Sequence, residues 1–228
     1  MKLLSVIIPV FNEEKTLEEI VRRVQEAPFP LEKELLIVDD ASVDGTRAIL
    51  ERLEGGNVRV FRHPVNRGKG AAIRTAQAHV QGDLVIIQDA DLEYYPEEYR
   101  LLAEPILDGR ADVTYGTRFI GTHRVFLYWH YLGNQFLTWI TNVLYNTMLS
   151  DMETCFKMCR AEIFKSLPLT CNRFGIEPEF TAKIFKRGCK VYEVPISYNG
   201  RGYEEGKKIT WRDGVAALWF LLKFRFTD

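Results

Sequence analysis

Residues 84–91, which read Leu-Val-Ile-Ile-Gln-Asp-Ala-Asp, decide the fold of this chain. The apolar part is short and β-branched, so it is predicted to be a buried strand. Asp89 and Asp91 cannot both point into the core at its end, because burying an unpaired charge costs too much free energy. We therefore expect both carboxylates to face a cleft, where such a pair suits a divalent cation that also holds phosphate oxygens.

Similar runs flank this stretch and alternate with helical patterns. The apolar runs cover residues 4–10, 35–38, 58–61 and 113–115, and the helical patterns cover residues 14–26, 45–53, 70–80 and 96–107. Such alternation predicts an α/β fold with βαβ units and a mainly parallel sheet. Ligands of such sheets bind at the carboxyl ends of the strands, which is where the polar motifs of this chain fall.

Length and composition set the outer limits. The chain has 228 residues, of which 46% are hydrophobic and 27% charged, so one domain with a sizeable core is expected. A net charge of −1 argues against nucleic acid as a partner. The first apolar run is too short for a signal peptide, and the four cysteines fit no zinc pattern, so a cytoplasmic location with reduced cysteines is expected.

The ends of the first and second strands carry candidate nucleotide contacts. Phe11 could stack beside a base and Glu13 could accept a hydrogen bond from it, although a plain turn is an equal reading. Asp39, with Asp40, could accept from a base N–H or a ribose hydroxyl. Ser42 or Asp44 is instead expected to cap the following helix.

Residues 66–72, Asn-Arg-Gly-Lys-Gly-Ala-Ala, open a helix after the third strand. The glycines let the backbone approach a ligand, and a helix N-terminus favours an anion. The spacing fits neither a Walker loop nor the Rossmann fingerprint, which argues against a P-loop NTPase and a dehydrogenase.

The second half is aromatic and carries no acid or lysine from residue 113 to 150. Leu132, Phe136, Ile140 and Val143 or Leu144 recur at helical spacing. Polar residues interrupt this segment, and the apolar C-terminal segment, residues 215–226, is short, so neither is expected to span a bilayer. The alternatives are amphipathic helices on a membrane surface or helices packed on the sheet.

The ordered set of residues 6–14, 37–42, 66–70 and 88–91 resembles family 2 glycosyltransferases of the GT-A fold. The set looks most like dolichyl-phosphate mannose synthases and related polyprenyl-phosphate glycosyltransferases. The resemblance implies a single GT-A domain over residues 1–228, with a Rossmann-like, mainly parallel sheet flanked by helices. Residues 1–115 would bind the nucleotide sugar, and residues 116–228 the acceptor.

The resemblance also implies site residues. Donor-binding residues would be Pro9, Phe11, Glu13, Ile37, Asp39, Asp40 and Lys69, together with Asp89, Ala90 and Asp91. The metal, Mg²⁺ or Mn²⁺, would be held by Asp89, Asp91 and Glu93. Arg118, in a Gly-Thr-Arg segment, and Arg201 and Lys207, in a late glycine-flanked loop, would contact phosphate. The catalytic residues would be Asp91, Arg118, Arg201 and Lys207.

The activity implied is inverting transfer of a hexose from GDP-mannose or UDP-glucose to a polyprenyl or dolichyl phosphate. The enzyme would act as a peripheral protein on the cytoplasmic face of a membrane. An anionic phosphate acceptor needs no general base, so catalysis would rest on positioning and charge stabilisation.

Two alternatives stay open. A hydroxyl acceptor on a glycan or glycolipid needs a base, for which the candidates are Asp151, Glu153, Glu177 and Glu179. A catalytically silent nucleotide-sugar-binding or scaffold subunit is the other alternative. Two departures from the relatives' pattern bear on donor and acceptor identity: Glu93 stands where relatives often have Gln or Ser, and residues 154–157, Thr-Cys-Phe-Lys, stand in place of Ser-Gly-Phe-Arg.

Overall fold

A computed structural model describes residues 1–125, 127–201 and 211–227. In chain order its elements are β1 (Leu3–Val10), α1 (Leu17–Glu26), β2 (Glu32–Asp39), α2 (Thr46–Leu53), β3 (Val58–Arg62), α3 (Lys69–Gln77), β4 (Leu84–Ile87), the 3-10 turn η1 (Pro96–Glu98), α4 (Tyr99–Leu107), β5 (Val113–Thr117), α5 (Tyr128–Tyr145), β6 (Lys157–Arg160), α6 (Ala161–Ser166), α7 (Ile176–Lys186), β7 (Val191–Pro195) and α8 (Trp211–Phe226).

The described strands form one sheet in the order β3-β2-β1-β4-β6-β5-β7. Strands β3, β2, β1 and β4 run parallel, β6 runs antiparallel to both β4 and β5, and β7 is parallel to β5. The chain winds from β1 outward to β3 and then returns to place β4 on the other side of β1. A ligand crevice is expected at this reversal, at the carboxyl ends of β1 and β4.

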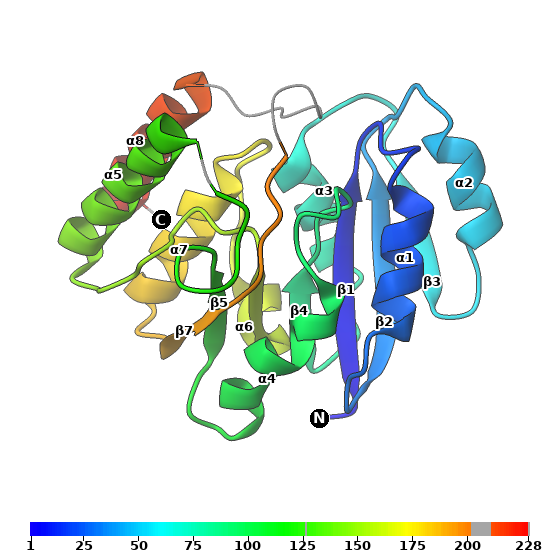
Figure 1. The fold of residues 1–228 in the computed structure, drawn as a ribbon, viewed down its shortest axis with the longest axis horizontal. Helices are drawn as coiled ribbons and strands as arrows, with labels where there is room; N and C mark the ends of the chain where they lie inside the picture. Colours follow the sequence, from blue (N-terminus) through cyan, green and yellow to red (C-terminus); the bar gives the residue numbers. More distant parts are fainter. Residues whose placement is uncertain (126, 202–210, 228) are drawn as a thin grey trace.

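Helices cover both faces of the sheet (Figure 1). One core layer packs Val6 and Ile8 of β1 against α1, α2 and α4. Ile7 lies in the other layer, with side chains from α3, α5, α6, α7 and α8. Successive residues of β1 thus point to opposite faces and are buried on both, which confirms the prediction of a mainly parallel sheet with two covered faces.

The second half contains the elements that the apolar pattern did not predict. β6 has only four residues, Lys157 to Arg160, and two of them are basic. It is inserted between β4 and β5, which a parallel βαβ pattern would have placed side by side. Both aromatic segments are helical. Helices α5 and α8 lie together at the end of the molecule far from β1–β3 (Figure 1). The Tyr145 hydroxyl of α5 donates a hydrogen bond to the Leu221 carbonyl of α8 at 2.8 Å. Within the described part of the chain, no helix combines the length and apolar character needed to cross a membrane.

Candidate active site at the strand ends

Three strand exits beside the predicted crevice contain a non-glycine residue in the left-handed region. They are Asn12 after β1, Ala41 after β2 and Leu92 after β4, with φ values of 55°, 63° and 63°. The first two turns hold each other: Asn12 N–H donates to Ser42 Oγ, and Val43 N–H donates to Asn12 Oδ1, both at 2.9 Å. Left-handed backbone of this kind persists only where the surroundings enforce it, and it gathers at functional sites.

Of the two residues expected to cap α2, only Asp44 bonds to its first turn. Gly45 occupies the N-cap position and makes no side-chain cap of its own. Ser42 ties the β1 turn as described above. Asp44 accepts from Thr46 N–H at 3.0 Å and from Glu14 N–H at 3.2 Å, so it also joins the β1 and β2 loops.

Asp89 lies directly beyond β4 and is paired with Lys69, the first residue of α3. Lys69 Nζ is 2.7 Å from Asp89 Oδ1 and 2.9 Å from Oδ2. Burial disfavours the charged ammonium, but Asp89 and Glu177 outweigh it and raise the pKa of Lys69 well above its usual value. A charged lysine is therefore paired with Asp89, the first acid of the Asp89-Ala90-Asp91 motif.

Asp91 faces a different cation, Arg201. The guanidinium lies 3.1 Å from Asp91 Oδ2 and 3.6 Å from carboxylate oxygens of both Glu13 and Glu93. Burial, followed by the negative charges of Asp89 and Glu93, raises the pKa of Asp91 to about 7, and Arg201 acts in the opposite direction. Residues from the ends of β1 and β4 and from the late loop thus meet at one acidic centre.

Glu93, predicted as a third metal ligand, bonds here to the segment that follows β7. One of its oxygens accepts from the Tyr198 hydroxyl at 2.6 Å, and the other accepts from Arg201 N–H at 2.8 Å. Glu93 therefore holds the segment that carries Arg201. Among the described residues, no three His, Cys, Asp or Glu side chains are arranged to hold an ion, and Glu93 as a third ligand beside Asp89 and Asp91 stays a prediction.

The remaining pair still fits a hard divalent cation. Mg²⁺ is usually bound through one or two carboxylates, with substrate phosphates completing its ligands. Burial and then the negative charges of Asp89 and Glu93 raise the pKa of Asp91, and a cation beside it would oppose both effects, as Arg201 does. The donor set of Asp89 and Asp91 is therefore suitable, and Glu93 is not required.

Asp39 and Asp40, though adjacent, have different surroundings. Asp40 accepts from Arg67 N–H at 2.9 Å and Gly68 N–H at 2.6 Å and contacts His63 Nδ1 at 2.6 Å, so it organises the loop before α3. Asp39 accepts from Ser42 N–H at 2.9 Å through Oδ1, whereas its buried Oδ2 has no hydrogen-bond partner. Because a buried polar atom is rarely left unpaired, Asp39 is the better candidate for a ligand contact.

Two residues predicted to bind the nucleotide-sugar donor have side chains in the core and not at the acidic centre. Ile37 and Ala90 are buried in the core layer that contains α1. Pro9 and Phe11 are partly exposed at the end of β1, beside Glu13. Lys207 lies outside the described residues.

Arg118 is buried at the end of β5, paired with Asp151. Its Nε and one terminal nitrogen each lie 2.7 Å from a different Asp151 oxygen, and its N–H donates to Oδ2 at 3.1 Å. The guanidinium also lies 5.3 Å from the centre of the Tyr198 ring. Since Tyr198 bonds to Glu93, Arg118 borders the acidic centre through that ring.

The other candidate bases are also mostly paired. Glu177 contacts Lys157 Nζ and lies 3.6 Å from Lys69 Nζ. Glu179 accepts from Lys183 at 2.7 Å and from Cys171 N–H at 2.8 Å, on the far side of α7. Glu153 differs, because one of its oxygens is buried without a hydrogen-bond partner, and burial raises its pKa to about 7.

Sequence reasoning missed Tyr198, Tyr94 and Lys157. Tyr94 stacks on Phe156 and lies tilted against Tyr198, with ring centres 5.1 Å from each, and its hydroxyl accepts from Cys155 N–H. Lys157 lies in the segment that departs from the relatives' pattern. That departure was the only sequence feature that pointed to Lys157, and no sequence feature pointed to Tyr94 or Tyr198.

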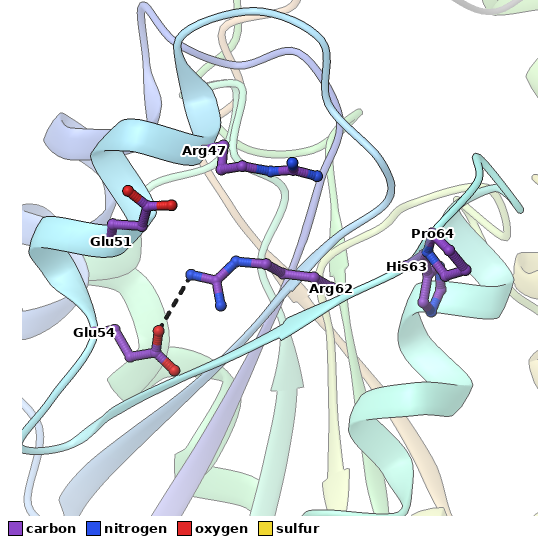
Figure 2. Close-up of a pocket in the computed structure, with 6 residues that line it drawn as sticks. All are labelled: Arg47, Glu51, Glu54, Arg62, His63 and Pro64. Atoms are coloured by element: carbon purple, nitrogen blue, oxygen red, sulfur yellow. Dashed lines mark hydrogen bonds and ion pairs between the residues drawn. The ribbon is translucent and has the colours of Figure 1, made fainter.

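Neither of two surface pockets is lined by Asp89 or Asp91. Figure 2 shows the first, between α2 and the end of β3. There Arg62 pairs with Glu54 at 3.2 Å, and the His63 ring is directed toward Asp40 instead. The second pocket lies among the loops around Tyr95, His123 and Tyr198.

A family model identifies the family of this chain. The model described as Glycosyl transferase family 2 matches residues 5–167. A relative from Methanocaldococcus jannaschii, the uncharacterized protein MJ1222, is 29% identical over 198 residues, covering 84% of this chain and 79% of its own.

Solved structures of glucosyl-3-phosphoglycerate synthase from Mycobacterium tuberculosis are similar in fold. One, solved with Mn²⁺, UDP and phosphoglyceric acid, has a TM-score of 0.75 at 21% identity, covering all of this chain and 80% of that one. Another has a TM-score of 0.74 at 24% identity, with 100% and 82% coverage. The GT-A fold expected from the sequence is confirmed, whereas the resemblance to dolichyl-phosphate mannose synthases stays a prediction. With the family model spanning most of the chain and both strand-end acids of the motif, this protein belongs to glycosyltransferase family 2.

Proposed function

We propose that this chain transfers a hexose, with inversion, from a nucleoside-diphosphate sugar of the GDP-mannose or UDP-glucose type to a polyprenyl or dolichyl phosphate. A divalent cation, Mg²⁺ or Mn²⁺, held by Asp89 and Asp91, would neutralise the diphosphate as its bond to the sugar breaks. The similar synthase binds UDP with Mn²⁺ or Mg²⁺, which supports this donor class.

On the donor side, the unpaired Asp39 oxygen would accept from the base or the ribose, with Phe11 and Glu13 beside it. Lys69 and Arg201 already lie on the two acids of the motif. Both cations are placed to move onto the diphosphate, where charge develops as the sugar leaves.

The state of the candidate bases carries the acceptor assignment. Asp151, Glu177 and Glu179 each face a cation, so a base at any of these positions would first have to leave its partner. A phosphate acceptor is already anionic and needs no proton removed. The pairing of these acids therefore supports transfer to phosphate, and Arg118 and Arg201, each now paired with a carboxylate, would divide between the acceptor phosphate and the leaving diphosphate.

The face formed by α5 and α8 supports a lipid acceptor. Trp129, Phe136, Trp139 and Val143 are exposed on α5 at helical spacing, whereas Leu137, Thr138 and Thr141 are buried on its other side. Trp219 and Phe226 of α8 are exposed as well. Exposed aromatic side chains on α5, which has no acidic residue, next to Lys223 and Arg225 at the end of α8, suit the interface of an anionic membrane.

An acceptor assay tests the proposal. The purified protein is given Mn²⁺, GDP-mannose or UDP-glucose, and one of three acceptors: a short prenyl phosphate, the matching prenyl alcohol, or 3-phosphoglycerate. We expect transfer to the prenyl phosphate alone. Equal transfer to the alcohol, or transfer only to 3-phosphoglycerate, would contradict a lipid-phosphate acceptor.

A hydroxyl acceptor is the second candidate, because of Glu153. A buried carboxyl with a pKa of about 7 and an unpaired oxygen is suited to removing a proton near neutral pH. If this candidate is right, Glu153→Gln abolishes transfer to the alcohol. If the acceptor is a phosphate, the same variant transfers at nearly the wild-type rate.

Vesicle sedimentation tests the membrane face. We expect wild-type protein to bind vesicles containing anionic lipid more tightly than neutral vesicles, and Trp129→Ser/Trp139→Ser to lose most of this binding. Leu101→Ser/Leu107→Ser, which removes exposed apolar side chains of α4, is the control and should bind like wild type. Equal loss in both variants would contradict a specific α5–α8 face.

A further inference from the structure

Four side chains from different elements form a line of alternating charge that ends in the active site. Lys157 of β6 contacts Glu177 of α7, Glu177 lies 3.6 Å from Lys69 of α3, and Lys69 contacts Asp89 beyond β4. The side chains of Lys157 and Glu177 are only 1% and 5% exposed. The line therefore runs from the interior to the motif.

The backbone of Lys69 is fixed independently of this line. A Cβ atom on Gly68 would lie 2.5 Å from the Asn172 carbonyl oxygen, and one on Gly70 would lie 2.4 Å from the Cys171 carbonyl oxygen. The start of α3 is therefore pressed against the loop that leads into α7. The long flexible stem of Lys69 is left for other groups to orient.

Glu177 is the group placed to orient it. Its Oε2 contacts Lys157 Nζ, and its Oε1 is buried without a hydrogen-bond partner, 3.6 Å from Lys69 Nζ. That separation gives electrostatic attraction without a hydrogen bond, so Lys69 is kept nearby but can turn toward another anion. With both oxygens facing ammonium groups, Glu177 is poorly suited to act as a base.

We propose that Glu177 is a positioning residue that, anchored by Lys157, holds the Lys69 ammonium beside Asp89 to meet the diphosphate of the donor. This inference rests on the proposed donor class and is independent of the acceptor. A buried ion pair is weak evidence for stability in itself. The functional meaning comes from where the line ends, on the first acid of the motif.

The test separates positioning from structural support. Glu177→Gln leaves Lys157 buried without its partner and should lower the thermal midpoint. It should also weaken binding of the nucleoside diphosphate with Mn²⁺, measured by calorimetry, by about 10- to 100-fold, as loss of supporting contacts does at other ligand sites. Glu177→Gln/Lys157→Met also removes the unpaired Lys157 ammonium. This double variant should recover most of the thermal midpoint lost in Glu177→Gln, while nucleotide binding stays weak.

Glu179→Gln is the matched control, because it makes the same change on the same helix and breaks a pair with Lys183 instead. It should lower the midpoint and leave nucleotide affinity unchanged. Recovery of nucleotide binding in the double variant would reduce Glu177 to a structural role and overturn the inference. A loss of kcat with unchanged nucleotide affinity would make it a base and also overturn it. Failure of the wild-type protein to bind GDP or UDP would overturn the proposed function itself.

Discussion

Asp89 and Asp91 are one residue apart, yet each is paired with a different cation. Lys69 reaches Asp89 from α3, and Arg201 reaches Asp91 from the segment that follows β7. The left-handed Leu92 turns the chain directly after Asp91. The motif thus gathers positive charge from both halves of the chain, as a diphosphate site requires.

The Arg118–Asp151 pair predicts a large effect on stability. Asp151→Asn keeps the shape of the side chain but leaves a buried guanidinium without its partner. We expect a loss of about 3–5 kcal/mol in the free energy of unfolding, measured by urea denaturation. Glu97→Gln, which breaks the more exposed pair with Arg23, should cost less than about 1 kcal/mol. Similar losses in the two variants would contradict the buried role of Arg118.

Glu153 predicts a pH dependence of stability. Its pKa is about 7 in the folded protein and near 4.5 in the unfolded chain, so between these values the folded state binds more protons. Stability should therefore fall as the pH rises from about 4.5 to 7. Glu153→Gln should remove about 1–3 kcal/mol of this loss in the free energy of unfolding. Above pH 7 the variant should therefore be more stable than wild type, as measured by urea denaturation at several pH values. Identical pH profiles would show that Glu153 is not buried as a neutral acid.

At the scale of single elements, the close approach of α3 to the loop before α7 predicts the effect of one methyl group. Gly70→Ala should destabilise the protein by about 1–3 kcal/mol, because the new Cβ would overlap the Cys171 carbonyl. The variant should also weaken nucleotide binding, since Lys69 is the adjacent residue.

Gly133→Ala is the control for that substitution. Gly133 lies inside α5, and no atom lies within 4 Å of a Cβ placed there. Alanine should therefore stabilise the helix by up to about 1 kcal/mol. Thermal midpoints that move in the same direction for both variants would contradict the packing described for α3.

The elements of the first half could be predicted because each has a local signal. The run at residues 84–87 coincides with β4, and the helical pattern at residues 45–53 differs from α2 by one residue. β6 could not be found in this way, because it contains Lys157 and Arg160. The buried lysine is balanced by Glu177, which is distant in the sequence.

The candidate site shows the same division. The places of Asp39, Asp89 and Asp91 at strand ends could be predicted from the apolar runs before them, whereas their roles as ligands stay predictions. The role of Glu93 was not, because its partners Tyr198 and Arg201 lie more than a hundred residues away in the chain. Asp40 looked like Asp39 in sequence, and only the folded loop at Arg67 and Gly68 distinguishes them.

For the whole molecule, the family assignment predicts which ligand stabilises the fold. The matching nucleoside diphosphate with Mn²⁺ should raise the thermal midpoint, since a ligand at about 100 times its Kd contributes roughly 2.7 kcal/mol. Only one of GDP and UDP should raise the thermal midpoint strongly, and its base identifies the donor. Equal small shifts with both would contradict base recognition by Asp39 and Glu13.

Transfer of hexose is the most direct test of the central claim, that Asp89 and Asp91 form the centre of a cation-dependent nucleotide-sugar site. Wild-type protein and Asp91→Asn are compared with the stabilising donor and prenyl phosphate, in Mn²⁺ and in excess EDTA. We expect transfer by the wild type in Mn²⁺ only, and a loss of at least about 100-fold in Asp91→Asn. Comparable transfer by the variant, or by the wild type in EDTA, would contradict the account.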